Sequence, residues 1–357
     1  MIEVTKPFLP PIGEYENLVK GVWESGWLTN NGTLVKQLEK GVASFVGMEE
    51  SIYVSNGTIA LQLAIAALGL EGDIITTPFS YVATTNSILW QKCNPVFADI
   101  DEDSLNIDSK QIRNSITKKT SAILATHVFG NPCNIEELEK IGNEFKIPII
   151  YDGAHALGTL YKGKSLLDYG TISITSFHAT KLFHTVEGGG VFSKDKLLLN
   201  KVRSLMNFGH SGTNTFEMAG INGKNSELHA AMGMTNLKYL DEIIAKRKSD
   251  YNYYQSILIE KKGLKFQKIS DNTDYNGSYF PVIFETEELL VRVNKKLMDN
   301  GIRPRRYFYP SLDRLPFLAS EIMTNSNSIA TRVMCLPMFY ELETVAIEKI
   351  CKTVLEA

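Results

Sequence analysis

Between residues 51 and 152 the sequence alternates short runs rich in Ile, Val and Thr with longer segments of helical apolar spacing. The predicted strands are 51–55, 74–77, 95–99, 121–126 and 148–152, and the predicted helices are 59–68, a segment ending at Trp90, and 135–145. Strands that alternate with helices at this spacing indicate parallel strands joined by helical crossovers. We therefore expect an α/β fold whose mostly parallel sheet has helices on both faces.

A ligand site is expected at one edge of that sheet. In open α/β sheets the ligand crevice lies outside the carboxyl ends of the strands. Five polar residues follow predicted strand ends, and we expect them to converge: Thr58, Tyr81, His127, Asp152 and Lys181.

The rest of the chain suggests a second, smaller unit. Residues 1–12 carry three prolines and are predicted to form an extended arm, and Thr33 is predicted to cap a helix. A loop rich in Gly and Asn is expected at 208–225, followed by a helical run at 227–258. We place a boundary near residue 238, giving a large domain (1–237) and a small C-terminal α/β domain (238–357) with a strand at 279–284 and helices at 289–300 and 341–355.

Composition excludes several classes of protein. With 357 residues and 44% hydrophobic content, the chain has the composition of an ordinary globular protein. Its formal net charge of -3 gives no excess of basic residues of the kind that binds nucleic acid. No stretch is long and apolar enough for a membrane span or a signal peptide. The four cysteines form no CxxC pair, so no metal site is expected, and their scatter favours a reducing compartment. We predict a cytoplasmic location.

Lys181 is the strongest candidate for covalent chemistry. It lies between a predicted strand beginning at Ser173 and the glycine run 188–190, so its amine can enter a cleft. A partly desolvated lysine has a lowered pKa and can form a Schiff base with a carbonyl. The plain alternative is a solvated lysine.

Other candidates supply what a phosphorylated pyridine cofactor requires, although each has a structural alternative. Gly57 and Thr58 follow Asn56 at a strand-to-helix turn, which suits a phosphate but also a simple helix cap. Tyr81 can stack on a planar ring or belong to the core. Asp152 can hold a proton on a ring nitrogen or cap a turn, and His155 is similarly ambiguous. Together with Lys181 they match the needs of pyridoxal 5'-phosphate, an electron sink.

The order and the residues of these segments resemble those of the DegT/DnrJ/EryC1/StrS sugar aminotransferases. The resemblance covers essentially the whole chain and is carried by SNGTIAL (55–61), PFSYVAT (78–84), YDGAHA (151–156), SFHATK (176–181) with EGG (187–189), and GINGKNSEL (220–228). It implies a pyridoxal-phosphate enzyme of fold type I. Because Lys181 is present where dehydratase members have histidine, it also implies transamination.

The resemblance implies a role for each matching position. Lys181 would carry the cofactor and move the proton, Asp152 would pair with the pyridine nitrogen, and His155 would lie near the phenolic oxygen. Tyr81 would stack on the ring, and Gly57, Thr58 and Ser176 would hold the phosphate.

A second subunit is also implied. Asn222 would reach the phosphate from a partner chain, which predicts a homodimer with shared sites. Lys224 stands where the family usually has Arg, and Lys keeps the charge but loses the bidentate fork. Its role therefore stays open.

The sequence around His178 and Phe183 resembles that of family members that aminate position 4 of a dTDP-4-keto-6-deoxyhexose with L-glutamate as donor. The implied substrate is dTDP-4-dehydro-6-deoxy-D-glucose, for a surface polysaccharide such as lipopolysaccharide O-antigen, or for a glycoside. Amination at position 3 and a non-catalytic pyridoxal-phosphate regulator are the alternatives.

A basic and aromatic loop at 301–310 is the predicted substrate wall. Arg303, Arg305 and Arg306 can bind a diphosphate or the carboxylate of the donor, and Tyr307 can stack on a base or sugar. The alternative is a solvated basic loop.

Overall fold

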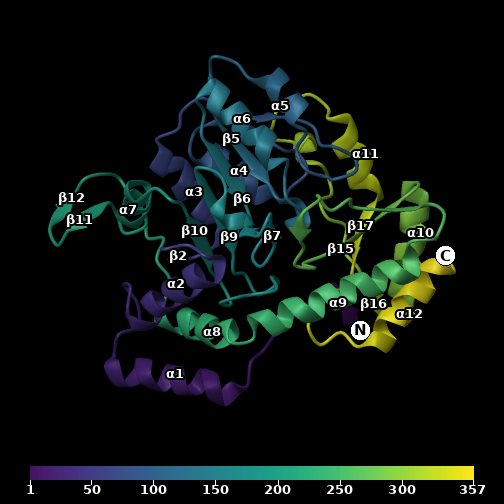
Figure 1. The fold of residues 1–357 in the computed structure, drawn as a ribbon, viewed down its shortest axis with the longest axis horizontal. Coiled ribbons are helices and arrows are strands. Elements are labelled where there is room, and N and C mark those ends of the chain that lie inside the picture. Colours follow the sequence, from purple (N-terminus) through teal and green to yellow (C-terminus); the bar gives the residue numbers. More distant parts are fainter.

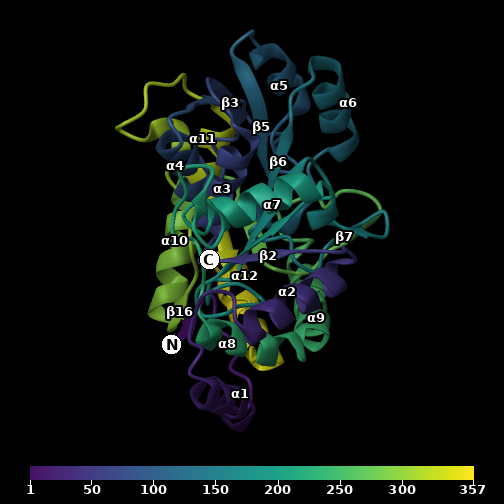
Figure 2. The ribbon, with the colours of Figure 1, turned by 90° about the vertical axis from the view of Figure 1, so that its left-hand side faces the viewer.

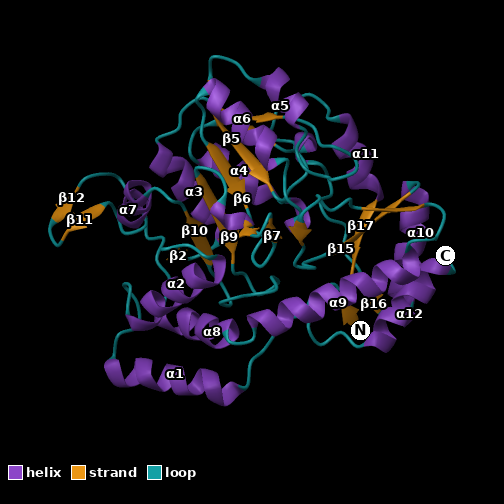
Figure 3. Ribbon diagram, in the orientation of Figure 1, coloured by secondary structure: helices purple, strands orange, loops and turns teal.

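A seven-stranded sheet lies at the centre of the larger part of the molecule (Figure 1, Figure 3). The computed structural model describes residues 1–357. In spatial order the strands are β2 (Ile52–Val54), β10 (Gly189–Phe192), β9 (Ile172–Ser176), β6 (Ile149–Asp152), β5 (Thr120–Thr126), β3 (Asp73–Thr76) and β4 (Asn94–Phe97). Only β10 runs antiparallel to its neighbours, so the predicted mostly parallel α/β sheet is confirmed.

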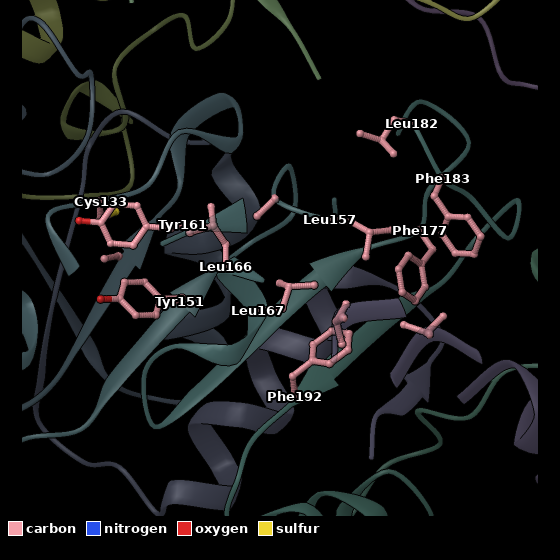
Figure 4. Packing of buried hydrophobic residues seen from close by; sticks show 14 of the residues in the cluster. Cys133, Tyr151, Leu157, Tyr161, Leu166, Leu167, Phe177, Leu182, Phe183 and Phe192 are labelled. Carbon is pink, nitrogen blue, oxygen red and sulfur yellow. The ribbon is translucent and has the colours of Figure 1, made fainter. Parts of the chain in front are cut away.

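Side chains alternate between two cores because successive residues of a strand point to opposite faces. Leu124 and Ile150 belong to the core on one face, whereas Ile123 and Tyr151 belong to the core on the other. The first face is covered by α3 (Gly57–Leu68), α4 (Val82–Trp90) and α7 (Lys196–Leu205); the second by α2 (Thr33–Val46), α5 (Ser109–Ser115), α6 (Ile135–Phe145) and α8 (Glu227–Leu237). Figure 4 shows part of the second core, where Phe177 and Phe183 pack edge to face.

The start of α2 corrects one prediction. Thr33 is the first helical residue, and Gly32 occupies the cap position without a side-chain hydrogen bond. The carboxylate of Glu227 instead accepts the free N–H groups of Leu34 and Val35, at 2.7 and 2.9 Å. A residue almost 200 positions away therefore satisfies donors that a local cap would otherwise take.

The C-terminal part is built on a small antiparallel sheet. It comprises β13 (Leu264–Phe266), β15 (Phe280–Phe284) and β17 (Val333–Leu336), with α9 (Leu240–Leu258), α10 (Glu287–Asp299), α11 (Thr324–Arg332) and α12 (Thr344–Leu355) around it. The N-terminal arm joins this part, because β1 (Ile2–Glu3) pairs with β16 (Ile302–Arg303). The domain boundary near residue 238 stays a prediction.

Two predicted segments differ from expectation in the structure. The helical run at 227–258 is interrupted between α8 and α9, and the predicted loop at 208–225 contains the hairpin β11 (His210–Gly212) and β12 (Thr215–Phe216), at the far left of Figure 1. The helix α1 (Ile12–Ser25) lies at the lower edge in both views (Figure 1, Figure 2). The other short strands are β7 (Leu160–Tyr161), β8 (Lys164–Ser165) and β14 (Thr273–Asp274). None of the helices has both the length and the apolar character to cross a bilayer.

Candidate active site

A cavity of about 650 Å³ opens at the carboxyl ends of the parallel strands. It is lined by residues at or after the ends of β2, β3, β6 and β9, together with three from the predicted substrate loop, Arg305, Tyr307 and Phe308. The predicted site residues that line it are Gly57, Thr58, Tyr81, Asp152, His155, Ser176, Lys181, Arg305 and Tyr307. The topology thus brings together segments that are more than 200 residues apart in sequence.

His127 does not belong to this group, although it follows β5. Its ring is buried, stacks on Tyr151 at a centroid distance of 4.5 Å, and accepts the N–H of Cys133 at 3.1 Å. Burial lowers the pKa of His127 to about 3, so the imidazole is neutral. The expectation that it joins the site is therefore wrong, because the chain turns its ring into the second core.

Lys181 sits on a tightly closed loop between β9 and β10. The amide of Ala179 donates to the carbonyl of Val186, and the amide of Lys181 donates to that of His178. Val186 has a φ of 66°, a conformation that a β-branched residue rarely adopts. The loop is thus held in a strained shape that presents the Lys181 amine to the cavity.

The electrostatic surroundings favour a neutral Lys181 amine. Burial lowers its pKa to about 8; Asp152 opposes this change, and Arg305 adds to it. The ammonium form loses hydration in the cavity, and the carboxylate restores only part of that loss. A substantial fraction of the amine is therefore unprotonated near neutral pH, as a nucleophilic lysine requires.

Asp152 ends β6 and is 5% exposed. One carboxylate oxygen accepts the hydroxyl of Thr84 at 2.8 Å, and the other accepts the N–H of Ala154 at 3.1 Å. Burial raises the pKa of Asp152, while these two hydrogen bonds and nearby Lys181 lower it. A carboxylate has about four lone-pair sites, so two remain for a ligand.

His155 contributes a buried ring with an unused nitrogen. The imidazole lies parallel to the ring of Phe308 at 6.0 Å and tilted against Tyr279 at 4.7 Å. Its Nδ1 is buried without a hydrogen-bond partner. Burial and the charge of Lys181 hold the pKa of His155 well below its usual range, so the ring is neutral.

The start of α3 forms a cradle for an anion. Asn56 caps the helix by accepting the N–H of Ile59, and the N–H groups of Gly57 and Thr58 lie in the first turn, where no intrahelical carbonyl reaches them. A Cβ on Gly57 would lie 3.0 Å from Cβ of Ser176, so only glycine fits without displacing that serine. The helix end and the serine hydroxyl therefore face the same small space.

These features fit pyridoxal phosphate. The cradle at Gly57 suits a phosphate, the lone pairs of Asp152 suit a protonated ring nitrogen, and the free Nδ1 of His155 suits a further polar atom of the ring. Tyr81 lines the cavity with an exposed fraction of 57%, which leaves its ring accessible for stacking. The role of each residue toward the cofactor stays a prediction.

The structure places the arginines of the predicted substrate loop in different surroundings. Arg303 pairs with Glu3 at 3.1 Å, and Arg306 pairs with Glu287 at 2.7 Å, and neither lines the cavity. Their role as substrate ligands stays a prediction. Arg305 lines the cavity, is exposed and forms no ion pair, and its guanidinium lies 4.7 Å from the ring of Tyr307.

Asn222 does not line this cavity either. It is exposed and pairs with Asn207 in an isolated bridge. Lys224 donates to the side chain of Asn207 at 2.8 Å and lies over the ring of Phe208. The structure holds one chain, so the predicted contribution of Asn222 to a partner's site stays a prediction.

Sequence reasoning missed several lining residues. The hydroxyl of Tyr279 lies 3.4 Å from the Lys181 amine, and Phe308 stacks beside His155. Tyr279 directly precedes β15 of the small sheet, and nothing local distinguishes it from core aromatics. Thr84 lies within the segment 78–84 that carries the family resemblance, but only its contact with Asp152 reveals its use.

Fold and site together define a pyridoxal-phosphate-dependent aminotransferase of fold type I. The chain belongs to the DegT/DnrJ/EryC1/StrS aminotransferase family, whose model matches residues 12–355. The predicted family, fold class, enzyme class and cofactor are thereby confirmed.

Three similar proteins illustrate the relationship. The dTDP-4-amino-4,6-dideoxy-D-glucose transaminase of Escherichia coli is 38% identical over 99% of this chain and 98% of its own. The UDP-2-acetamido-2-deoxy-3-oxo-D-glucuronate aminotransferase of Pseudomonas aeruginosa is 32% identical over 90% of this chain and 89% of its own. The crystal structure of DesI in the presence of its TDP-sugar product superposes with a TM-score of 0.94 at 30% identity, covering 99% of this chain and 92% of that one.

Proposed function

We propose that the protein transfers the amino group of L-glutamate to position 4 of dTDP-4-dehydro-6-deoxy-D-glucose. The product is then a dTDP-4-amino-4,6-dideoxy sugar for a surface polysaccharide, such as lipopolysaccharide O-antigen, or a glycoside, made in the cytoplasm. The 38% identity to a transaminase named for that product supports position 4 over position 3. The likeness to DesI, whose crystals contain a TDP-sugar product, supports the nucleotide.

One observation carries the catalytic part of this proposal. The Lys181 amine, whose pKa is lowered to about 8, shares one cavity with Asp152 and Arg305. A half-buried lysine beside a carboxylate and an unpaired guanidinium is an unusual arrangement, and perturbed groups of this kind cluster at functional sites.

The residues have separate tasks. When bound, the cofactor would supply a carbonyl group and an electron sink. The neutral Lys181 amine would be the nucleophile toward that carbonyl, and as a base it would take a proton from the donor's α-carbon and return it to the acceptor. Asp152 holds the cofactor ring by its nitrogen, and Arg305 binds the donor carboxylate or the substrate diphosphate.

A homodimer is part of the proposal. The exposed Asn222 lies outside its own chain's cavity, which leaves it available to a second copy. Lys224 lies two residues further on and would bring its charge to the same place. Molecular mass in solution by light scattering tests the dimer, and Asn222→Ala should weaken cofactor binding without changing the mass.

The decisive experiment is incubation of the purified protein and pyridoxal phosphate with L-glutamate and a panel of nucleotide-linked keto sugars. We expect an amine at carbon 4 of the dTDP sugar, identified by NMR, and no product with Lys181→Ala. An amine at carbon 3 would overturn the regiochemistry. A protein that binds the cofactor but leaves its absorbance unchanged with glutamate would be a binder and not an enzyme.

A further inference from the structure

Three buried hydroxyl groups form a chain of hydrogen bonds that ends on Asp152. Thr126 donates to the hydroxyl oxygen of Ser80 at 3.2 Å, Ser80 and Thr84 are 2.8 Å apart, and Thr84 donates to Asp152 at 2.8 Å. All four side chains are at least 95% buried, and all four line the cavity.

This chain of hydrogen bonds crosses three neighbouring strands at their carboxyl ends. Thr126 ends β5, directly opposite Asp152 at the end of β6. Ser80 follows β3, and Thr84 lies in the first turn of α4. Ser80 also precedes Tyr81, so the chain joins the segment that carries the predicted stacking ring to the acid that faces the same cavity.

The hydrogen bond from Thr84 to Asp152 sets the direction of the hydrogen-bonded chain. An ionised carboxylate only accepts hydrogen bonds, so Thr84 gives its single hydroxyl proton to Asp152. Thr84 must then accept from Ser80, and Ser80 accepts from Thr126. Hydrogen bonds aligned in one direction polarise one another and strengthen the final bond to the carboxylate.

Thr84 lies too close to the start of α4 for the hydrogen bond that helical hydroxyls commonly make, because the residue four positions earlier is Ser80 and α4 begins at Val82. Within a helix, Ser and Thr hydroxyls commonly bond the carbonyl four residues earlier. Ser87, one turn further along α4, does so by donating to Ala83 at 2.7 Å. Thr84 instead points across to another strand, and the fold thereby directs its proton to the acid.

We infer that Thr126, Ser80 and Thr84 are positioning residues that fix the Asp152 carboxylate for the ring nitrogen of the cofactor. This inference rests on the proposed function, because it assigns a purpose to the acid in that site. Burial disfavours the charged carboxylate, and the donated hydrogen bonds oppose that effect. The hydrogen bonds therefore favour the charged carboxylate, which is the form that pairs with a protonated ring.

The test uses Thr84→Val, which keeps the shape of the side chain and removes the donor. Pyridoxal phosphate is titrated into each apoprotein to obtain the dissociation constant, and the visible absorbance of the holoprotein is followed against pH. We expect the dissociation constant of the cofactor to rise roughly tenfold, which is the effect of losing one hydrogen bond to a charged group. We also expect the pH midpoint of the visible band to move upward, because a less protonated ring withdraws less charge from the Schiff-base nitrogen.

Matched variants separate this role from a structural one. Thr84→Ser keeps the hydroxyl and should restore both values. Thr85→Val is the control, because its neighbouring hydroxyl is equally buried but has no partner. Ser80→Ala and Thr126→Val should give smaller changes in that order, and Ser80→Ala should add nothing to Thr84→Val.

The outcomes distinguish a failure of this inference from a failure of the proposed function. If the wild-type protein forms the visible band and transfers nitrogen, but Thr84→Val matches it in dissociation constant and midpoint, the hydroxyl chain has no positioning role. Equal midpoint changes in Thr85→Val would likewise overturn it. A wild-type protein that forms no visible band would overturn the proposed function together with this inference.

Discussion

The lowered pKa of Lys181 can be measured through the rate at which the apoprotein captures its cofactor. Only the neutral amine attacks a carbonyl, so the capture rate follows the unprotonated fraction. With a pKa of about 8, roughly a quarter of the amine is neutral at pH 7.5, against about 0.1% for an ordinary lysine. The structure therefore predicts an advantage of about 200-fold at that pH.

Stopped-flow absorbance of apoprotein mixed with pyridoxal phosphate, from pH 6 to 11, provides the assay. The rate should rise to about pH 8 and then level off; a free lysine analogue under the same conditions corrects for ionisation of the cofactor itself. A rate that keeps climbing above pH 10 would refute the argument that burial sets this pKa.

Two variants test the signs of the charge effects. Asp152 raises the pKa of Lys181 and Arg305 lowers it. Asp152→Asn should therefore move the midpoint downward, and Arg305→Ala should move it upward. Shifts in the same direction would show that these charges do not act on the amine as the geometry requires.

Three further predictions follow from the same site. Gly57→Ala should weaken cofactor affinity about tenfold in a cofactor titration, because the added methyl group pushes on the anion cradle. Gly13→Ala is the control and should leave the affinity unchanged, since its methyl group meets no atom within 4 Å. Arg305→Ala should raise the KM for glutamate or the sugar nucleotide at least tenfold with unchanged melting temperature, because it removes a charge-assisted contact. Arg306→Ala should instead lower stability by about 1 kcal/mol in urea unfolding and leave KM unchanged, since its partners are structural. Tyr279→Phe should lower kcat about threefold, because its hydroxyl lies at a long 3.4 Å from the Lys181 amine; a hundredfold loss would contradict this.

Local patterns in the sequence predict the sheet and single out Lys181 as the candidate for covalent chemistry. Alternating strand and helix segments determine a parallel sheet because short buried runs and amphipathic helices can bury their apolar faces in few other ways. Parallel strands end at one edge, so residues at or after strand ends, such as Asp152 and Lys181, are predicted from the sequence to share one site. Residues whose role depends on a backbone turn, such as Gly57, are predictable for the same reason.

Side-chain partners across the fold were decided only by the tertiary structure. Arg303, Arg305 and Arg306 look alike in sequence, yet strand pairing and packing neutralise two of them and leave one in the cavity. Thr84 donates to Asp152 at the end of β6, a partner that the local sequence around Thr84 does not reveal. Hydrogen bonds and ion pairs are short-ranged and directional, so a sequence that specifies where the backbone goes still leaves open which groups meet.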